Sequence, residues 1–239
     1  MSKRAIPTVA ADFQGVMTHL AERGIVPERF PADDAGIAKR MHRATYSLIL
    51  WRFRLPKMPE HAKWFVEEIA SDSLQVLPQA MIGFGKTTKL LIRGVVENVL
   101  RHVYFADHPI EFRRMNDRGK WYVGVDELLE YAGEHPLIAE AEKKFDAVHR
   151  LRTLYDELSA GVHGRRVTDL ETRRAVAEVR YDRSTFELHT LAVEKCAEAT
   201  NFVLAIFHKD HFHKFTAEDR HIITNTMTPG CRKICYGLT

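Results

Sequence analysis

The chain has 239 residues, 45% of them hydrophobic and 28% charged, with a formal net charge of +3. This length is enough to bury a sizeable core without metals or disulfides, and three cysteines, an odd number, fit reduced thiols better than a disulfide framework. The small net charge does not by itself establish a nucleic-acid partner. No apolar run reaches the ~20 residues of a membrane span, and the N-terminus lacks a secretory signal. We therefore expect a cytoplasmic protein without membrane contact.

Hydrophobic residues recur at helical spacing along nearly the whole chain. The periodicity predicts helices at about residues 8–23, 33–54, 59–82, 86–106, 125–132, 137–163, 184–209 and 216–227. Asp33 and Asp34 are placed to cap the second of these helices. Pro56 and Pro59 separate it from the third, and Thr216 begins a capping box for the last.

Two segments depart from the helical pattern. Residues 174–187 hold valines and aromatic residues that are compatible with a short strand or hairpin. Residues 107–124 read as an extended polar connection that joins two helical halves. Neither segment is a linker long enough to separate two domains.

The pattern therefore predicts a single all-α bundle with extra N-terminal helices and at most a short hairpin. The expected core helices are 59–82, 86–106, 137–163 and 184–209, with the N-terminal helices packed outside them. Along the chain, this division gives accessory helices over 1–57, the bundle core over 58–210, and a C-terminal helix and tail over 211–239.

A phosphate-binding loop is one alternative function, because residues 80–88 (AMIGFGKTT) carry Gly-Lys-Thr at nearly the spacing of that motif. A working loop needs a glycine where Ala80 stands, a buried strand before it, and a later acidic residue at a strand end. The preceding residues look helical or irregular instead. The pattern favours a helix–helix turn in which Gly83 and Gly85 provide tight geometry.

A metal site is another alternative, because histidines and cysteines gather near the C-terminus: His208, His211, His213, His221, Cys231 and Cys235. Imidazole and thiolate are the ligands that zinc prefers. The spacing of these residues, however, matches no recurring ligand pattern. We therefore predict no metal and no cofactor, and interpret the segment as a polar surface with two half-buried thiols.

The run LYDELSAGVHG, residues 154–164, places a serine and a histidine before a glycine that ends a helix. Gly164 is predicted to follow the last helical turn, so His163 lies where unpaired carbonyls and the helix dipole favour positive charge. A histidine at this position could take part in catalysis. The alternative is that the segment is only the ordinary end of a helix.

Two of the predicted helices carry polar residues at four-residue spacing. Arg93 and Glu97 share one face of the first helix and can pair. Tyr155, Ser159 and His163 form a stripe on the second helix. If the two stripes face each other, a histidine, hydroxyls, an arginine and a carboxylate converge. The alternative is a polar seam that only fixes the register of the helices.

Residues 92–97 (IRGVVE) and 154–164 resemble recurring segments of uncharacterised bacterial helical proteins that are distantly similar to HEPN domains. The likeness spans about residues 70–210. It implies a helical bundle, commonly dimeric, of a kind that often cuts RNA without metal in toxin–antitoxin, abortive-infection and CRISPR defence systems. The family signature is an arginine followed four to six residues later by a histidine, which meets its dimer mate across a cleft.

This sequence departs from that signature. His163 corresponds to the family histidine, yet none of the residues five to seven positions before it is an arginine. Arg152 lies eleven residues earlier, about 16 Å along the helix axis, which is too far to share one phosphate easily. The arginine is expected instead from the neighbouring helix as Arg93, or from the following turn as Arg165 or Arg166. Without such a substitution, the resemblance implies binding or assembly rather than cleavage.

The implied chemistry is transesterification, in which His163 exchanges a proton with the ribose 2′-hydroxyl or the leaving oxygen while an arginine stabilises the phosphate. Ser159, Tyr155 and Glu97 complete the candidate site. The basic residues expected to contact RNA are Arg113, Arg114, Arg118, Lys120, Arg165, Arg166, Arg173 and Arg174. Phosphate contacts of this kind give salt-dependent affinity without sequence choice, and the alternative is that these side chains are only solvated.

Three functional hypotheses follow. The first is a HEPN-like, RNA-directed protein of a bacterial anti-phage defence or toxin system, a homodimer that acts as a metal-independent ribonuclease. The second is a non-catalytic helical subunit that holds a multi-protein defence complex together through a protein partner. A third hypothesis, nucleotide hydrolysis through the Gly-Lys-Thr segment, requires that the chain bind ATP or GTP.

Overall fold

The computed structural model describes residues 8–26, 30–55, 58–118, 122–164, 167 and 172–237. Over these residues the regular structure is helical and no strand occurs, which confirms the all-α prediction. The α-helices are α1 (Val9–Glu22), α2 (Ala35–Arg54), α3 (Glu60–Ile82), α4 (Gly85–Asp107), α5 (Pro109–Arg118), α6 (Val125–Glu134), α7 (Ala139–Phe145), α8 (Ala147–His163), α9 (Arg183–Phe207), α10 (Lys209–Phe212), α11 (Ala217–Thr224) and α12 (Pro229–Cys235). None of the described helices is long and apolar enough to cross a bilayer.

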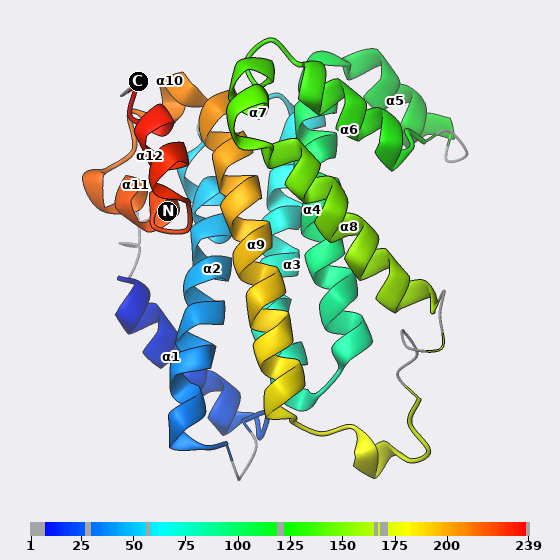
Figure 1. Ribbon diagram of the computed structural model, residues 1–239, viewed down its shortest axis with the longest axis vertical. Helices are drawn as coiled ribbons and strands as arrows, with labels where there is room; N and C mark the ends of the chain where they lie inside the picture. The colour runs from blue at the N-terminus through cyan, green and yellow to red at the C-terminus, as the bar shows by residue number, and fades with distance from the viewer. Residues whose placement is uncertain are drawn as a thin grey trace.

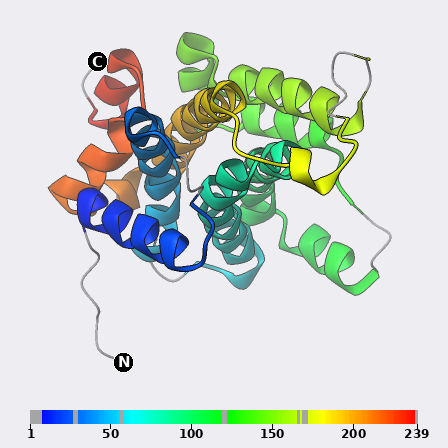
Figure 2. The same cartoon turned by 90° about the horizontal axis from the view of Figure 1, so that it is seen from below.

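Five long helices, α2, α3, α4, α8 and α9, form the bundle (Figures 1 and 2). Helix α4 packs against α3, α8 and α9, so its side chains fill much of the core. The expectation that both N-terminal helices pack outside is wrong for α2, which packs between α3 and α9 and buries Met41 and Trp51 completely. Helix α1 does lie outside, and buries only Phe13 and Leu20.

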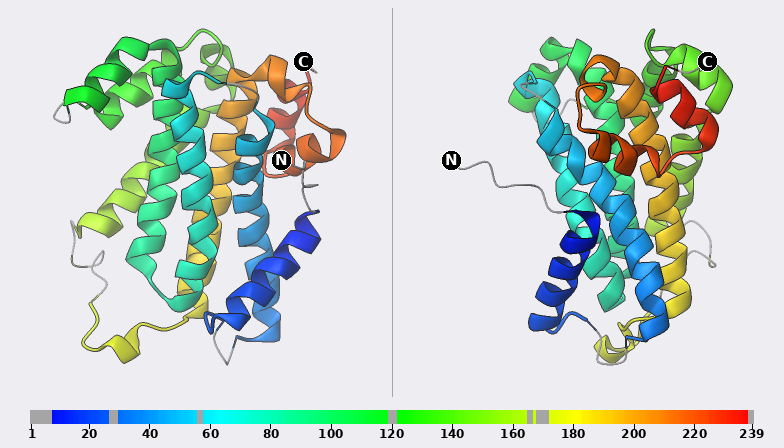
Figure 3. Two further views of the ribbon diagram at one scale, coloured as in Figure 1. Left: turned by 180° about the vertical axis from the view of Figure 1, so that it is seen from behind. Right: turned by 90° about the vertical axis from the view of Figure 1, so that its left-hand side faces the viewer.

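The short helices other than α1 lie toward one end of the bundle (Figure 1). Helices α5 and α6 lie on one side of this end, and α10, α11 and α12 lie on the other, beside α2 and α9 (Figure 3). The opposite end carries the turn between α3 and α4 and the segment that leads into α9 (Figure 1). The two ends of the bundle are therefore built from different parts of the chain.

Three predicted segments differ in the structure. The connection expected over 107–124 contains α5, whose first residue, Pro109, stands where a missing N–H costs nothing. The helix expected over 137–163 is divided at Asp146, which has a left-handed φ of 49°. Helix α12 lies in the predicted tail. The described part of 174–187 forms a 3₁₀ turn, Val176–Glu178, and the start of α9 rather than a hairpin.

The Gly-Lys-Thr segment is a helix–helix turn. Gly83 follows α3 with φ 92°, and a Cβ there would lie 2.2 Å from the carbonyl oxygen of Arg180, so only glycine fits. Gly85, Lys86 and Thr87 form the first turn of α4 directly after this turn. Because a helix rather than a strand precedes it, this segment lacks the framework of a phosphate-binding loop.

The two predicted caps have different outcomes. Asp34 stands before α2 but accepts no capping hydrogen bond; its carboxylate instead accepts from the Tyr181 hydroxyl at 2.5 Å and pairs with Arg183 at 3.1 Å. Thr216 does cap α11, because its hydroxyl accepts the backbone N–H of Asp219 at 3.1 Å and donates to the Asp219 carboxylate.

Replacing Thr216 with alanine should lower the free energy of unfolding by about 1 kcal/mol, since the backbone N–H of Asp219 then loses its acceptor. Urea unfolding followed by circular dichroism measures this change. Thr153→Ala is the matched control: its hydroxyl bonds only to the His149 carbonyl one turn back in α8, and alanine has the higher helix propensity. Equal loss in both variants would contradict the cap assignment.

Candidate functional site

The face between α4 and α8 brings an arginine, a tyrosine and a histidine into contact. The Arg93 guanidinium donates to the Tyr155 hydroxyl at 2.9 Å and lies 3.3 Å from His163 Nε2. The same guanidinium lies 4.9 Å from the centre of the Tyr155 ring, within cation–π range. The two polar stripes expected from the sequence therefore face each other.

Glu97 holds Arg93 from one turn along α4. One carboxylate oxygen pairs with Arg93 at 2.9 Å, and the other pairs with Arg101 at 3.1 Å. The side chains of Arg93 and Glu97 are 19% and 16% exposed, so their pair is shielded from water more than a surface ion pair. Arg93 is thus fixed in direction before any ligand arrives.

His163 lies at the exposed end of α8. Gly164 follows it with φ 59° and donates its N–H to the Ala160 carbonyl at 2.9 Å, which is the glycine helix end expected from the sequence. Because a guanidinium only donates hydrogen bonds, His163 Nε2 accepts from Arg93 in this arrangement, and the proton of the neutral ring is on Nδ1.

Ser159 does not reach the exposed face. The residue is 3% exposed, and its hydroxyl has no hydrogen-bond partner among the described residues. The stripe drifts around α8 between Tyr155 and His163, so Ser159 is turned toward the bundle interior. We therefore remove Ser159 from the groups that could contact a substrate.

A cavity of about 430 Å³ opens beside Arg93, on the side that carries Tyr155. It is lined by Arg93, Glu97 and Arg101 from α4, by residues 122–126 and Leu129, and by Arg152, Tyr155 and Asp156 from α8. Arg101 was not predicted from the sequence, and Arg152 was excluded by its distance from His163 along the helix. The signals were present, since Arg101 follows Glu97 at one-turn spacing and Arg152 precedes Tyr155 by three residues on the same face.

Asp72 on α3 lies behind this site. Its carboxylate packs against Gly94, where an added Cβ would lie 2.3 Å from Oδ2. Burial, and then the negative charge of Glu68, raises the pKa of Asp72 to about 7, while a hydrogen bond from Asn98 acts in the opposite direction. A carboxyl group on α3 that faces Gly94 of α4 therefore titrates near neutral pH.

The predicted RNA-contacting residues are not gathered in one place. Arg113 and Arg114 are exposed on α5, at one end of α4, whereas Arg173 and Arg174 are exposed in the segment before α9, at the other end (Figure 1). The side chain of Arg118 and all of Lys120, Arg165 and Arg166 lie outside the described residues.

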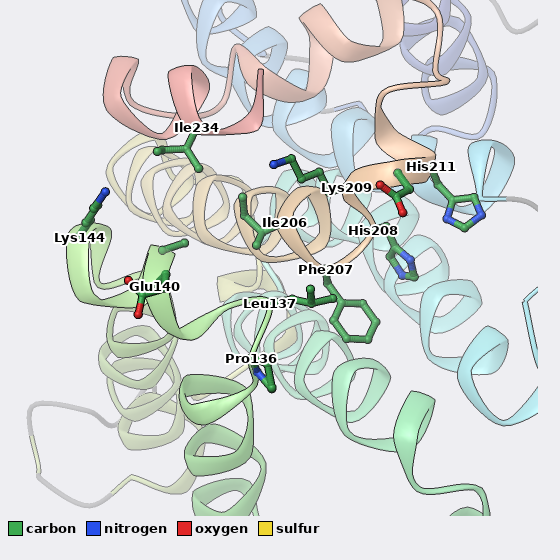
Figure 4. Close-up of a pocket in the computed structure, with 12 residues that line it drawn as sticks. Pro136, Leu137, Glu140, Lys144, Ile206, Phe207, His208, Lys209, His211 and Ile234 are labelled. Atoms are coloured by element: carbon green, nitrogen blue, oxygen red, sulfur yellow. The ribbon is translucent and has the colours of Figure 1, made fainter. Parts of the chain in front are cut away.

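The C-terminal histidines and cysteines are dispersed. His208 is half-buried, and its Nε2 lies 2.7 Å from Nε2 of the buried His102. Together with His211, it lines a cavity of about 560 Å³ (Figure 4). Cys231 and Cys235 are fully buried rather than half-buried, and burial raises the pKa of the Cys235 thiol to about 12. Among the described residues, no three potential metal ligands are grouped.

Comparison of the chain with known protein families, curated proteins and solved structures finds no match in any of the three.

Proposed function

We propose that the chain is an RNA-directed helical protein that cleaves RNA without a metal ion, with His163 and Arg93 as the reacting pair. The observation that carries the proposal is the 3.3 Å contact between the Arg93 guanidinium and His163 Nε2 at an exposed helix end. This contact places a group that can exchange a proton, the His163 imidazole, beside a fixed positive charge, the Arg93 guanidinium. Phosphate transesterification needs both kinds of group.

In the proposed reaction, His163 takes the proton from the ribose 2′-hydroxyl as the 2′-oxygen attacks the adjacent phosphorus. The bond from phosphorus to the 5′-oxygen breaks, and that oxygen takes up a proton from water, while His163 later returns its proton to the solvent. The products are a 2′,3′-cyclic phosphate and a 5′-hydroxyl. Arg93 donates its hydrogen bonds to the phosphate oxygens as their negative charge grows, and so exchanges its contact with His163 for one with the substrate.

The wider setting follows the resemblance of residues 92–97 and 154–164 to HEPN-like proteins. We propose a bacterial anti-phage defence or toxin system, with a homodimer as the assembled form. Arg93 replaces the arginine that the family carries on the histidine's own helix. Its place across the α4–α8 contact supports this substitution.

A second candidate is a non-catalytic subunit of a multi-protein defence complex. The ion pairs of Glu97 with both Arg93 and Arg101 favour it, because a shielded carboxylate shared by two arginines also serves to fix helix register. In that case, the site is a structural seam, and the function is contact with a protein partner.

The test is incubation of the purified chain with labelled total RNA and tRNA, in EDTA and at low salt, with DNA of matched length as the control substrate. We expect RNA fragments ending in 2′,3′-cyclic phosphate and intact DNA, because DNA lacks the 2′-hydroxyl. Absence of cleavage by the chain, alone and with any co-purifying partner, would overturn the ribonuclease proposal and favour the assembly subunit.

A further inference from the structure

The cavity beside Arg93 has an aromatic residue at its edge. Tyr122 lines it and is 79% exposed, which makes it the most exposed aromatic residue in the described part of the chain. Exposure of an aromatic ring carries a hydration cost that a stacked partner removes. A nucleic-acid base offers such a partner, because every base has a flat face that stacks on an aromatic ring.

Three guanidiniums line the same cavity: those of Arg93, Arg101 and Arg152. Three carboxylates also line it, so an anion enters only where an ion pair opens. The pair of Arg152 with Asp126 at 2.6 Å is the one that opens readily, because its side chains are 41% and 89% exposed and such pairs contribute little stability. A phosphate can then bind the freed guanidinium through two hydrogen bonds.

The cavity and the reacting pair share Arg93. Its guanidinium contacts His163 through Nη1 and contacts Tyr155 and Glu97, which line the cavity, through Nη2. A chain whose scissile phosphate lies at Arg93 therefore has its neighbouring nucleotide beside or inside the cavity. The volume of about 430 Å³ is within the range of sites that hold small ligands.

We infer that this cavity is a nucleotide subsite that selects single-stranded RNA, with a phosphate on Arg152 and a base stacked on Tyr122. The inference rests on the proposed function and names its substrate class. A base in a duplex is already stacked and paired, so it cannot reach Tyr122 without a cost of unstacking. Single strands and loops present their bases freely.

The experiment measures binding without cleavage. The probe is a fluorescein-labelled ten-nucleotide RNA with 2′-O-methyl groups, as a single strand and as a duplex, and fluorescence anisotropy gives the dissociation constants. Tyr122→Ala should weaken single-strand binding about tenfold, whereas Tyr122→Phe, which keeps the stacking ring, should bind as the wild type does. Trp64→Ala, at an exposed aromatic residue of α3 outside the cavity, is the matched control and should change nothing.

Cleavage of unmodified RNA is measured on the same proteins. If the wild type cuts RNA while Tyr122→Ala binds and cuts equally well, the subsite is wrong and the proposed function stands. Equal affinity of the wild type for duplex and single strand would also overturn the subsite. If the wild type neither binds nor cuts RNA, the proposed function fails and the subsite fails with it.

Discussion

Alanine at position 163 should lower the rate of RNA cleavage by about 10²- to 10⁴-fold, the usual contribution of a positioned proton-transfer group. The change removes the imidazole but little else, since His163 is exposed and its contact with another side chain is the 3.3 Å approach to Arg93. Thermal unfolding should therefore stay close to that of the wild type. Single-turnover cleavage of a labelled RNA oligomer measures the rate.

The companion variant Arg93→Lys separates catalysis from structure. Lysine keeps the positive charge beside Glu97 but cannot donate two parallel hydrogen bonds, so we expect cleavage to fall at least tenfold while the fold is retained. Under the structural alternative, both variants change stability or partner binding, and any RNA cleavage is unaffected. If a variant loses activity and also shows no cooperative unfolding transition, it has lost its fold, and this result would count against a catalytic role.

The free energy of unfolding should fall by roughly 3 to 6 kcal/mol between pH 6.5 and pH 4 through buried His102 and its half-buried partner His208. Burial lowers the pKa of His102 to about 4 and that of His208 to about 3. His102 Nδ1 donates to the Ala62 carbonyl, so its Nε2 must accept the hydrogen bond from His208. A second proton would place two N–H groups against each other.

The sign follows from proton uptake. Below pH 6.5, the unfolded chain protonates both histidines while the folded chain keeps them neutral, so stability is full above pH 6.5 and is lost as the pH falls. Asp72 acts in the opposite direction between pH 7 and pH 4, because its pKa is raised in the folded state. A comparison of variants is therefore needed to isolate the histidines.

The variant His102→Gln/His208→Gln provides that comparison, since glutamine does not titrate and can still donate to the Ala62 carbonyl. Urea unfolding at half-unit pH steps should show that unfolding takes up about two fewer protons near pH 5 than in the wild type. Replacement of exposed His213 by glutamine is the control. An unchanged slope in the double variant would mean that both histidines are protonated in the folded chain.

The long helices could be predicted because each carries a continuous apolar stripe, as α3, α4 and α9 do. The division at Asp146 could not, because it depends on the Glu142 carboxylate, which turns back to accept the backbone N–H groups of Val148 and His149. The role of Asp34 could not be predicted either. Its residue type and position are those of a helix cap, yet it accepts a hydrogen bond from Tyr181, 147 positions away, and no local sequence pattern predicts that contact.

The site was predictable to the extent that it depends on spacing within a helix. Four-residue spacing placed Arg93 with Glu97 and Tyr155 with His163, and packing of α4 on α8 brought the pairs together. Spacing could not show that Ser159 turns inward. Nor could spacing show that Arg152 lines a cavity with Arg93. The two residues lie on different helices, and spacing along one helix does not give the distance between them.

The two exposed arginine pairs, on α5 and before α9, are separated by the length of α4, whose 23 residues extend about 35 Å. Gly83 fixes one end of that span, since Arg180 packs against it, and Pro109 begins α5 at the other. A strand that engages both pairs must follow the bundle for that whole distance. Under the proposed function, an RNA oligonucleotide shorter than this span engages only one arginine pair, so its affinity should rise once its length exceeds about 35 Å.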